Sequence, residues 1–162
     1  MEAHFSEDYL HFGDFLVSPE RSGRDVEAIW KLLSLRQGSS VLELGCGYGR
    51  ITNGLADKGA RVTGLDTSPI LLKKADADAA ERRVNVEYVL GDMRSLPWRN
   101  RFYAVFLWYT TFGFFSEAEN ERVLHETASS LRKGGRTIAS LRCVTSFLPA
   151  GSCSVTMICV ST

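Results

Sequence analysis

The chain of 162 residues carries glycines and acidic residues at a spacing that suits the binding of a charged ligand. Three glycines alternate with other residues in Glu43-Leu-Gly45-Cys-Gly47-Tyr-Gly49, between an apolar run and an amphipathic one. Glycine permits a sharp turn after a buried strand, and the N–H groups of the following helix can hold an anion such as the carboxylate of an amino-acid moiety. Asp66 ends the next apolar run, where its carboxylate can accept hydrogen bonds from both hydroxyls of a ribose. The two features predict a site for a ligand with an anionic end and a ribose.

Two other interpretations of these glycines stay open. A nicotinamide or flavin dinucleotide domain has a similar topology, but its fingerprint is G-x-G-x-x-G, and the sixth position here is Arg50. A long arginine disfavours the close packing that a pyrophosphate-binding turn needs. The glycines could also serve only as tight-turn residues. The acidic Glu43, two places before the first glycine, points away from the dinucleotides.

The elements that must position these residues follow an alternating pattern. Short apolar runs alternate with longer amphipathic ones, which is typical of a parallel sheet with crossover helices. We therefore predict an α/β fold, Rossmann-like and doubly wound, with a mainly parallel sheet and helices on both faces. The predicted strands are 41–44, 61–65, 84–89, 102–108 and 137–141. The predicted helices are about 22–35, 50–58, 69–82 after the N-cap Ser68, and a fourth that begins at the capping box Ser116-x-x-Glu119 and ends at Gly134-Gly135.

Composition argues against several kinds of partner. The chain has 19 Lys and Arg against 19 Asp and Glu and a pI of about 6.8, so it presents no broad positive field to nucleic acid or to a membrane. Its longest apolar run, 104–109, is far shorter than the roughly 20 residues of a spanning helix. The first residues do not resemble a signal peptide, so we expect a cytoplasmic protein. No metal site is predicted, because residues 107–109 supply no carboxylate and the cysteines lack C-x-x-C spacing.

Four motifs in order give the sequence a specific resemblance. Over roughly residues 20–141 it resembles the class I S-adenosylmethionine-dependent methyltransferases, and residues 112–124 are similar to the bacterial small-molecule branch of that superfamily. The four motifs are the glycine segment 41–50, Gly64-Leu-Asp66-Thr-Ser68, Gly91-Asp92-Met93 followed by Leu96-Pro97, and Leu131-Arg-Lys-Gly-Gly-Arg136.

The resemblance implies S-adenosylmethionine as cofactor, with S-adenosylhomocysteine as product. It implies that Asp66 binds the ribose with Thr67 beside it, that Asp92 and Met93 flank the adenine after Gly91, and that Leu107 ends the fourth strand near the sulfonium. It assigns the amino-acid end of the cofactor to a loop made by Glu43, Gly45, Cys46, Gly47 and Gly49. Residue chemistry agrees, because a carboxylate can accept a hydrogen bond from an amine and a thioether offers a polarizable surface to a ring. Asp92 could instead be a plain turn residue, and Cys46 is a small residue that fits a crowded turn.

The resemblance further implies methyl transfer by in-line displacement to an O, N or C acceptor on a small molecule. Aromatic and threonine side chains just after the fourth strand could line an apolar acceptor pocket or could pack in the core. They are Trp108, Tyr109, Thr110, Thr111, Phe112 and Phe115. The candidate catalytic residues are Tyr109 and, from the N-terminal segment, Tyr9 and His11. A histidine is the natural general base for a hydroxyl acceptor, although His11 could simply face solvent.

The chain divides into three parts by composition and resemblance. The resemblance implies that residues 1–20 form a lid or cap segment and that 21–142 form the S-adenosylmethionine-binding methyltransferase domain. Residues 143–162 are an uncharged tail that holds three of the four cysteines. The stretch 153–159 alternates in polarity and could add an edge strand, through which a homodimer could form.

The tail does not resemble the two strands and helix with which this family usually continues. A second hypothesis is therefore a module that binds S-adenosylmethionine but has impaired catalysis. A third is an NAD-dependent oxidoreductase. The identity of the acceptor depends on loops that vary freely on one scaffold, so the sequence does not predict it.

Overall fold

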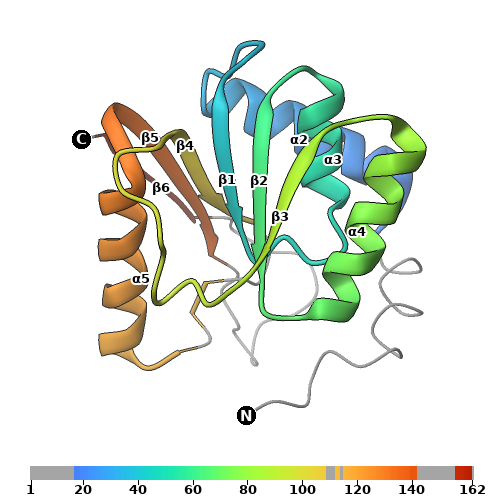
Figure 1. Cartoon of the computed structure of the whole chain (residues 1–162). Coiled ribbons are helices and arrows are strands. Elements are labelled where there is room, and N and C mark those ends of the chain that lie inside the picture. The colour runs from blue at the N-terminus through green and yellow to red at the C-terminus, as the bar shows by residue number, and fades with distance from the viewer. Residues whose placement is uncertain (1–16, 109–111, 114, 142–155, 162) are drawn as a thin grey trace, which may run out of the picture.

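The computed structural model describes residues 17–108, 112, 113, 115–141 and 156–161 (Figure 1). Helices and strands alternate from Pro19 to Leu90, as the pattern of apolar runs predicted, and the next strand then follows without an intervening helix. In order they are α2 (Pro19–Leu32), β1 (Ser40–Leu44), α3 (Arg50–Asp57), β2 (Arg61–Asp66), α4 (Pro69–Arg82), β3 (Val86–Leu90), β4 (Phe102–Leu107), α5 (Glu117–Ser130), β5 (Leu131–Leu141) and β6 (Thr156–Ser161).

The strands form one sheet in the order β3-β2-β1-β4-β5-β6. The pairs from β3 to β5 are parallel, and β6 runs antiparallel to β5 at the edge. The predicted α/β fold with five parallel strands is therefore confirmed, and the edge strand lies at Thr156–Ser161, while residues 153–155 are outside the described residues. The chain reverses its direction of strand addition between β1 and β4, which is where ligands bind in open parallel sheets.

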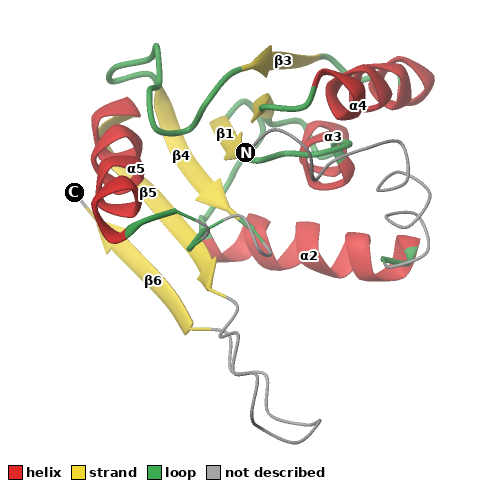
Figure 2. Ribbon diagram, turned by 90° about the horizontal axis from the view of Figure 1, so that it is seen from below, coloured by secondary structure: helices red, strands yellow, loops and turns green. Residues whose placement is uncertain are grey.

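Helices α2 and α3 lie on one face of the sheet, and α5 lies on the other (Figure 2). One core joins α2 and α3 to the sheet and includes the fully buried Ile29, Leu55 and Phe106. The other core lies under α5 and the connection between β3 and β4, and includes Phe102 and Val123. Central strands β1 and β4 contribute to both cores, which explains why β4 is almost continuously apolar and why β1 is mostly apolar.

Serine N-caps set the starts of three helices. Ser68 accepts a hydrogen bond from the N–H of Leu71 and is followed by proline, so α4 has the predicted bounds. Ser116 forms the predicted capping box with Glu119 at the start of α5. Helix α2 begins earlier than predicted, at Pro19, because Ser18 and Pro19 repeat the serine-proline pair of α4.

The end of α5 and the start of β5 correct the sequence-based prediction. The helix ends at Ser130 and the chain enters β5 directly, so Gly134 and Gly135 lie inside the strand and not after a helix. Leu131 pairs with Phe102 and both side chains are buried, and the register then shifts between Phe102 and Ala104. Gly134 has a φ of 74°, a left-handed conformation that glycine adopts readily at such an irregularity. Strand β3 begins at Val86, two residues later than the predicted start at 84. Arg83 caps the end of α4 in a left-handed conformation just before it.

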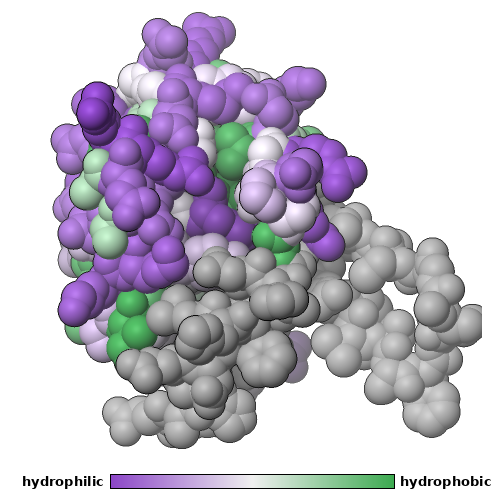
Figure 3. All heavy atoms as spheres, turned by 90° about the vertical axis from the view of Figure 1, so that its right-hand side faces the viewer, coloured by the Kyte–Doolittle hydropathy of each residue, from purple (hydrophilic) through white to green (hydrophobic). Residues whose placement is uncertain are grey.

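Hydrophilic side chains cover most of the described surface on the α4 side of the molecule (Figure 3). Among the described residues the exposed large apolar side chains are scattered over α2, α4, β3 and α5: Leu32, Ile70, Leu90 and Leu124. None of the helices in the described ranges is both long enough and apolar enough to pass through a bilayer.

Candidate functional site

The carboxyl ends of β1, β2, β3 and β4 lie along one edge of the sheet, at the bottom of Figure 1. Because the strands are parallel and adjacent, the loops that follow them meet there. The edge therefore gathers the glycine loop after β1, Asp66 at the end of β2 and Asp92 after β3. Sequence reasoning predicted this grouping, since all three features stand at strand ends.

Asp66 ties the end of β2 to the glycine loop. Its carboxylate accepts hydrogen bonds from the backbone N–H of Gly47, at 2.8 Å, and from the N–H of Ser68, at 2.9 Å. The N–H groups of Gly45 and Cys46 donate to the carbonyl of Leu65, at 2.8 and 3.0 Å. The loop is thus held against β2 by backbone groups, and Asp66 has a fixed orientation while remaining partly exposed.

Two glycines of the loop have different surroundings. Gly49 has a φ of 79°, and a Cβ there would stand 2.3 Å from Tyr88 Oη and 2.8 Å from Ala75 Cβ. The tyrosine is held in place because its hydroxyl donates to Asn53 Oδ1 at 2.7 Å. Gly47 has a φ of 55°, and none of the described heavy atoms lies within 4 Å of where its Cβ would be. Gly49 is therefore required by packing, whereas Gly47 leaves the face of the loop open.

Glu43 lies beneath the loop and is almost completely buried. Its Oε2 accepts a hydrogen bond of 2.5 Å from the hydroxyl of Thr52, in the first turns of α3. Burial raises the pKa of Glu43 to about 8, against the opposing effects of the Thr52 hydroxyl and of nearby Arg50. Burial, together with the charges of Glu43 and Asp66, also raises the pKa of the Cys46 thiol. The group under the loop is therefore a mostly protonated acid at neutral pH.

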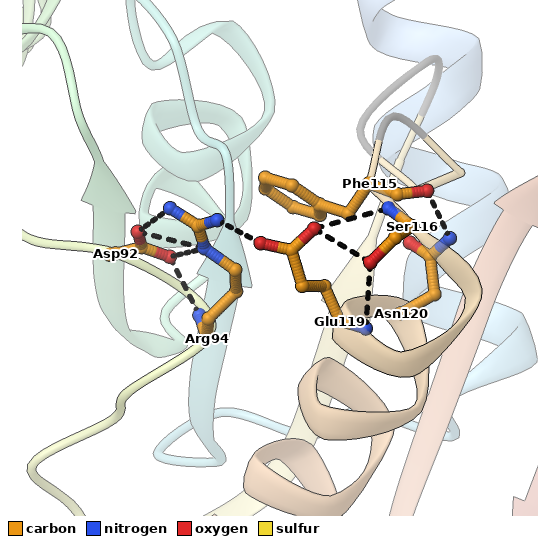
Figure 4. A network of polar contacts seen from close by, with 6 residues as sticks. All are labelled: Asp92, Arg94, Phe115, Ser116, Glu119 and Asn120. Carbon is orange, nitrogen blue, oxygen red and sulfur yellow. Dashed lines mark hydrogen bonds and ion pairs between the residues drawn. The ribbon is translucent and has the colours of Figure 1, made fainter. Parts of the chain in front are cut away.

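Asp92 belongs to a polar network that links β3 to α5 (Figure 4). Its Oδ1 accepts from the backbone N–H of Arg94 at 2.8 Å, and its two oxygens accept from Arg94 Nε at 3.1 and 3.0 Å. Arg94 Nη2 donates to Oδ2 at 2.6 Å, and Nη1 donates to Glu119 Oε1 at 2.5 Å. The Arg94 hydrogen bonds, outweighing burial, lower the pKa of Asp92. Asp92 is thus an ionised acceptor with much of its capacity already used.

The remaining predicted cofactor residues stand at the same edge in different environments. Thr67 is exposed, and Gly91 and Met93 are partly buried, with Met93 packed on the core under α5. Cys46 and Leu107 are buried, so their side chains fill the interior.

The candidates for catalysis and for the acceptor pocket are only partly described. The three catalytic candidates, Tyr9, His11 and Tyr109, lie outside the described residues, as do Thr110 and Thr111. Of the aromatic candidates, Trp108 packs on the core of α2 and α3, while Phe112 and Phe115 pack on the core under α5. These three side chains are therefore partly buried at the end of β4 and at the start of α5.

Arg50 faces away from the sheet edge toward α2. Its Nη1 lies 2.8 Å from Asp25 Oδ2, with both side chains largely buried. A hollow of about 570 Å³ adjoins this pair, lined mainly by residues of α2 and α3 together with Tyr48. Neither Asp66 nor Asp92 lines it, so we do not place the ligand site there. No group of three or more His, Cys, Asp or Glu among the described residues is arranged to hold a metal ion.

Sequence reasoning missed Thr52, Asn53 and Arg94. Thr52 and Asn53 stand on one turn of α3 facing the loop and β3, but their partners Glu43 and Tyr88 come from two different strands. The pair Asp92-x-Arg94 was visible as opposite charges two residues apart. Its extension to Glu119 depends on how α5 packs, which no local pattern reveals.

Comparison with known proteins gives one family and several relatives. The family described as "Methyltransferase domain" matches residues 41–135, more than half of the chain. The cypemycin N-terminal methyltransferase of a Streptomyces species is 36% identical over 100 residues, which cover 60% of this chain and 40% of the relative. A ubiquinone biosynthesis O-methyltransferase of Alkalilimnicola ehrlichii is 42% identical over 52 residues, which cover 32% of this chain and 21% of the relative.

Among solved structures, the PH0226 protein of Pyrococcus horikoshii superposes with a TM-score of 0.75 at 28% identity, covering 88% of this chain and 65% of that chain. The matched residues cover less than half the length of each of the two curated relatives.

Proposed function

Because the chain belongs to the class I S-adenosylmethionine-dependent methyltransferases, we propose that it binds S-adenosylmethionine at the carboxyl edge of β1–β4 and methylates a small molecule. The observation that carries the proposal is the Asp66 carboxylate, held by the N–H groups of Gly47 and Ser68 beside the open face of the glycine loop. A carboxylate held in this way can accept hydrogen bonds from both hydroxyls of a ribose.

The residues at this edge fit the cofactor in three places. A carboxylate has about four lone-pair sites, so Asp66 can accept two ribose hydroxyls besides its two backbone donors. Helix α3 has Gly49 as its N-cap, which offers no side-chain oxygen, so the N–H groups of its first turn can hold the carboxylate of the amino-acid end. Asp92 can accept a hydrogen bond from the exocyclic amine of adenine, with Met93 beside the ring. The residues present therefore fit the group.

Glu43 supports the loop from below. Its hydrogen bond with Thr52 joins the end of β1 to α3, and these elements flank the glycines. The pKa of Glu43 is raised by burial. A nearby cation, such as the ammonium of the amino-acid end, would favour the ionised form of this carboxyl. We assign Glu43 to that end of the site.

The bound cofactor would supply a sulfonium methyl group, and the protein would align the acceptor and exclude water. Alignment of two reactants in ideal geometry contributes of order 7 to 11 kcal/mol. Water exclusion strengthens the remaining electrostatic interactions. Trp108, Phe112 and Phe115 lie where an apolar acceptor wall is expected. We retain Tyr9, His11 and Tyr109 as candidates for contact with the acceptor, with His11 as the general base for a hydroxyl.

The two curated relatives described above support an O or N acceptor, and a C acceptor stays an alternative. One is named an N-terminal methyltransferase and the other an O-methyltransferase of ubiquinone biosynthesis. The comparisons do not favour the NAD-dependent oxidoreductase. The chain matches only part of these relatives, so the acceptor is a proposal about its class and not its identity.

Calorimetric titration with S-adenosylmethionine, S-adenosylhomocysteine and NAD tests the proposal. Binding of the two adenosyl compounds without binding of NAD is expected, and the reverse would refute the proposal. Mass spectrometry of candidate acceptors, for the mass gained when methyl replaces hydrogen, then separates an active enzyme from a module that binds the cofactor without turnover.

A further inference from the structure

Arg94 occupies a position between the two halves of the proposed site. On one side its guanidinium and its backbone N–H hold Asp92, which we assign to adenine. On the other side it donates to Glu119, in the first turn of α5, and its Cζ lies 4.6 Å from the centre of the Phe115 ring. Figure 4 shows the guanidinium lying between the two carboxylates.

The Asp92 side of this arrangement restricts the carboxylate. Two nitrogens of the guanidinium fork and one backbone N–H contact its two oxygens, which fixes its rotamer. A lysine ammonium is a point charge and cannot reproduce this planar contact. The direction in which Asp92 presents its remaining lone pairs therefore depends on Arg94.

The α5 side is also fixed by more than one contact. Glu119 accepts from the hydroxyl and the N–H of Ser116 as well as from Arg94. Asn120 Nδ2 donates to the carbonyl of Phe115 at 2.9 Å. The start of α5 and Phe115 thus form one unit that contacts the segment after β3 through Arg94.

Global stability is a weak explanation for these ion pairs. The side chains of Arg94, Asp92 and Glu119 are 36%, 38% and 42% exposed. Ion pairs at this exposure are screened by water and contribute little to unfolding free energy. Their effect should appear in the geometry of the site.

We propose that Arg94 is a positioning residue, which aims the Asp92 carboxylate at the adenine amine and, through Glu119 and Phe115, joins the adenine end of the site to the acceptor side. This inference rests on the proposed function, because it assigns Asp92 to adenine. It adds a residue that ties cofactor recognition to the start of α5.

Titration of Arg94→Lys with two ligands tests the inference. The first ligand is S-adenosylhomocysteine, and the second is its analogue in which hydrogen replaces the exocyclic amine of the purine. Arg94→Lys should weaken binding of S-adenosylhomocysteine about tenfold, the effect of one charge-assisted hydrogen bond, and should change binding of the analogue less than twofold. An equal loss for both ligands, no loss, or tighter binding of S-adenosylhomocysteine would overturn the inference, the last because Arg94 would then compete with adenine for Asp92.

Glu119→Gln tests the connection to α5. Glutamine preserves the capping box but removes the charge that holds Arg94. We expect a smaller loss of S-adenosylhomocysteine affinity, of about threefold, again without an effect on the analogue. Unchanged affinity for S-adenosylhomocysteine would overturn the connection.

Arg82→Lys is the matched control. Arg82 pairs with Asp57 at 2.8 Å, with similar exposure, on helices away from Asp92. It should leave both affinities unchanged, and a loss equal to that of Arg94→Lys would overturn the inference. Urea unfolding of each variant reports its folding. If the unmodified protein does not bind S-adenosylhomocysteine, the proposed function itself fails. If the unmodified protein binds S-adenosylhomocysteine and Arg94→Lys binds it with the same affinity, only the inference on Arg94 fails.

Discussion

The carboxylate of Asp66 accepts a hydrogen bond of 2.8 Å from the backbone N–H of Gly47. This contact joins the end of β2 to the loop after β1, so one side chain has two tasks. Under the proposed function it offers lone pairs to a ribose, and it also holds the backbone of the glycine loop through Gly47. A change at Asp66 should therefore affect the whole cofactor site and not one hydrogen bond alone.

Asp66→Ala should weaken S-adenosylhomocysteine binding by an order of magnitude or more. The reason is the loss of charge-assisted hydrogen bonds, each contributing roughly 1.5–3 kcal/mol. Titration calorimetry measures the loss. Asp78→Ala removes a carboxylate that pairs with Lys74 within α4, and it should leave the affinity unchanged. Equal affinity of Asp66→Ala and the unmodified protein would remove the ribose assignment.

Gly49→Ala should destabilise the fold by about 3 kcal/mol, because a side chain at this left-handed position would be strained and would collide with Tyr88. Gly47→Ala meets no described atom, so it should destabilise the fold by only about 1 kcal/mol. Its methyl group would enter the face of the loop, and we expect it to weaken S-adenosylhomocysteine binding at least tenfold. Urea unfolding and calorimetry provide the two readouts.

Gly38→Ala is the control for the glycine variants. Gly38 also has a positive φ, of 80°, and open surroundings, but it precedes β1 at the opposite edge of the sheet. It should lose as much stability as Gly47→Ala and keep full affinity. A loss of affinity in Gly38→Ala would show that strain alone explains the result at Gly47.

The stability of the ligand-free protein should fall as pH rises from about 4.5 to about 8, through the Glu43 carboxyl. In that window the unfolded chain releases the proton, while the folded protein keeps it because burial raises the pKa. The contribution is complete below about pH 4.5 and is lost as the pH rises through about 8. The total change should be on the order of 3–5 kcal/mol.

Urea unfolding across this pH range, compared with Glu43→Gln, measures the contribution. Glutamine keeps the shape and an acceptor for Thr52 but has no proton to release. The difference between the two unfolding free energies should therefore vary with pH. Parallel curves for the two proteins would show that Glu43 does not titrate in this window.

Local signals explain which elements the sequence could predict. Ser68 and Pro69 lie next to each other and define the start of α4 without any distant contact. Asp66 and the glycines stand at strand ends, so their convergence follows from a parallel sheet alone. The pair Gly134-Gly135 is different, since two glycines suit both a helix end and a strand irregularity. The contact of Leu131 with Phe102 on β4 decides between them, and it belongs to tertiary structure.

The polar partners of the site were beyond prediction for the same reason. The sequence predicts Glu43 as part of the loop, but its environment depends on the hydrogen bond that Thr52 donates to it from α3. The sequence predicts Asp92 as an adenine contact, but its carboxylate is held by Arg94, which in turn contacts Glu119 on α5. Each is a contact between side chains on different elements, whose relative placement is set by core packing.

The strand order has a consequence for how the protein is made. Strand β1 lies between β2 and β4, but α3, β2, α4 and β3 are all synthesised after β1 and before β4. A nascent chain ending after Met93 would carry every residue assigned to the cofactor except Leu107, while one edge of β1 would still lack its partner. Strand β1 can complete its pairing only after Phe102–Leu107 has been synthesised and lies beside it. Until then the chain presents an unpaired apolar strand edge, the form in which chaperones would meet it.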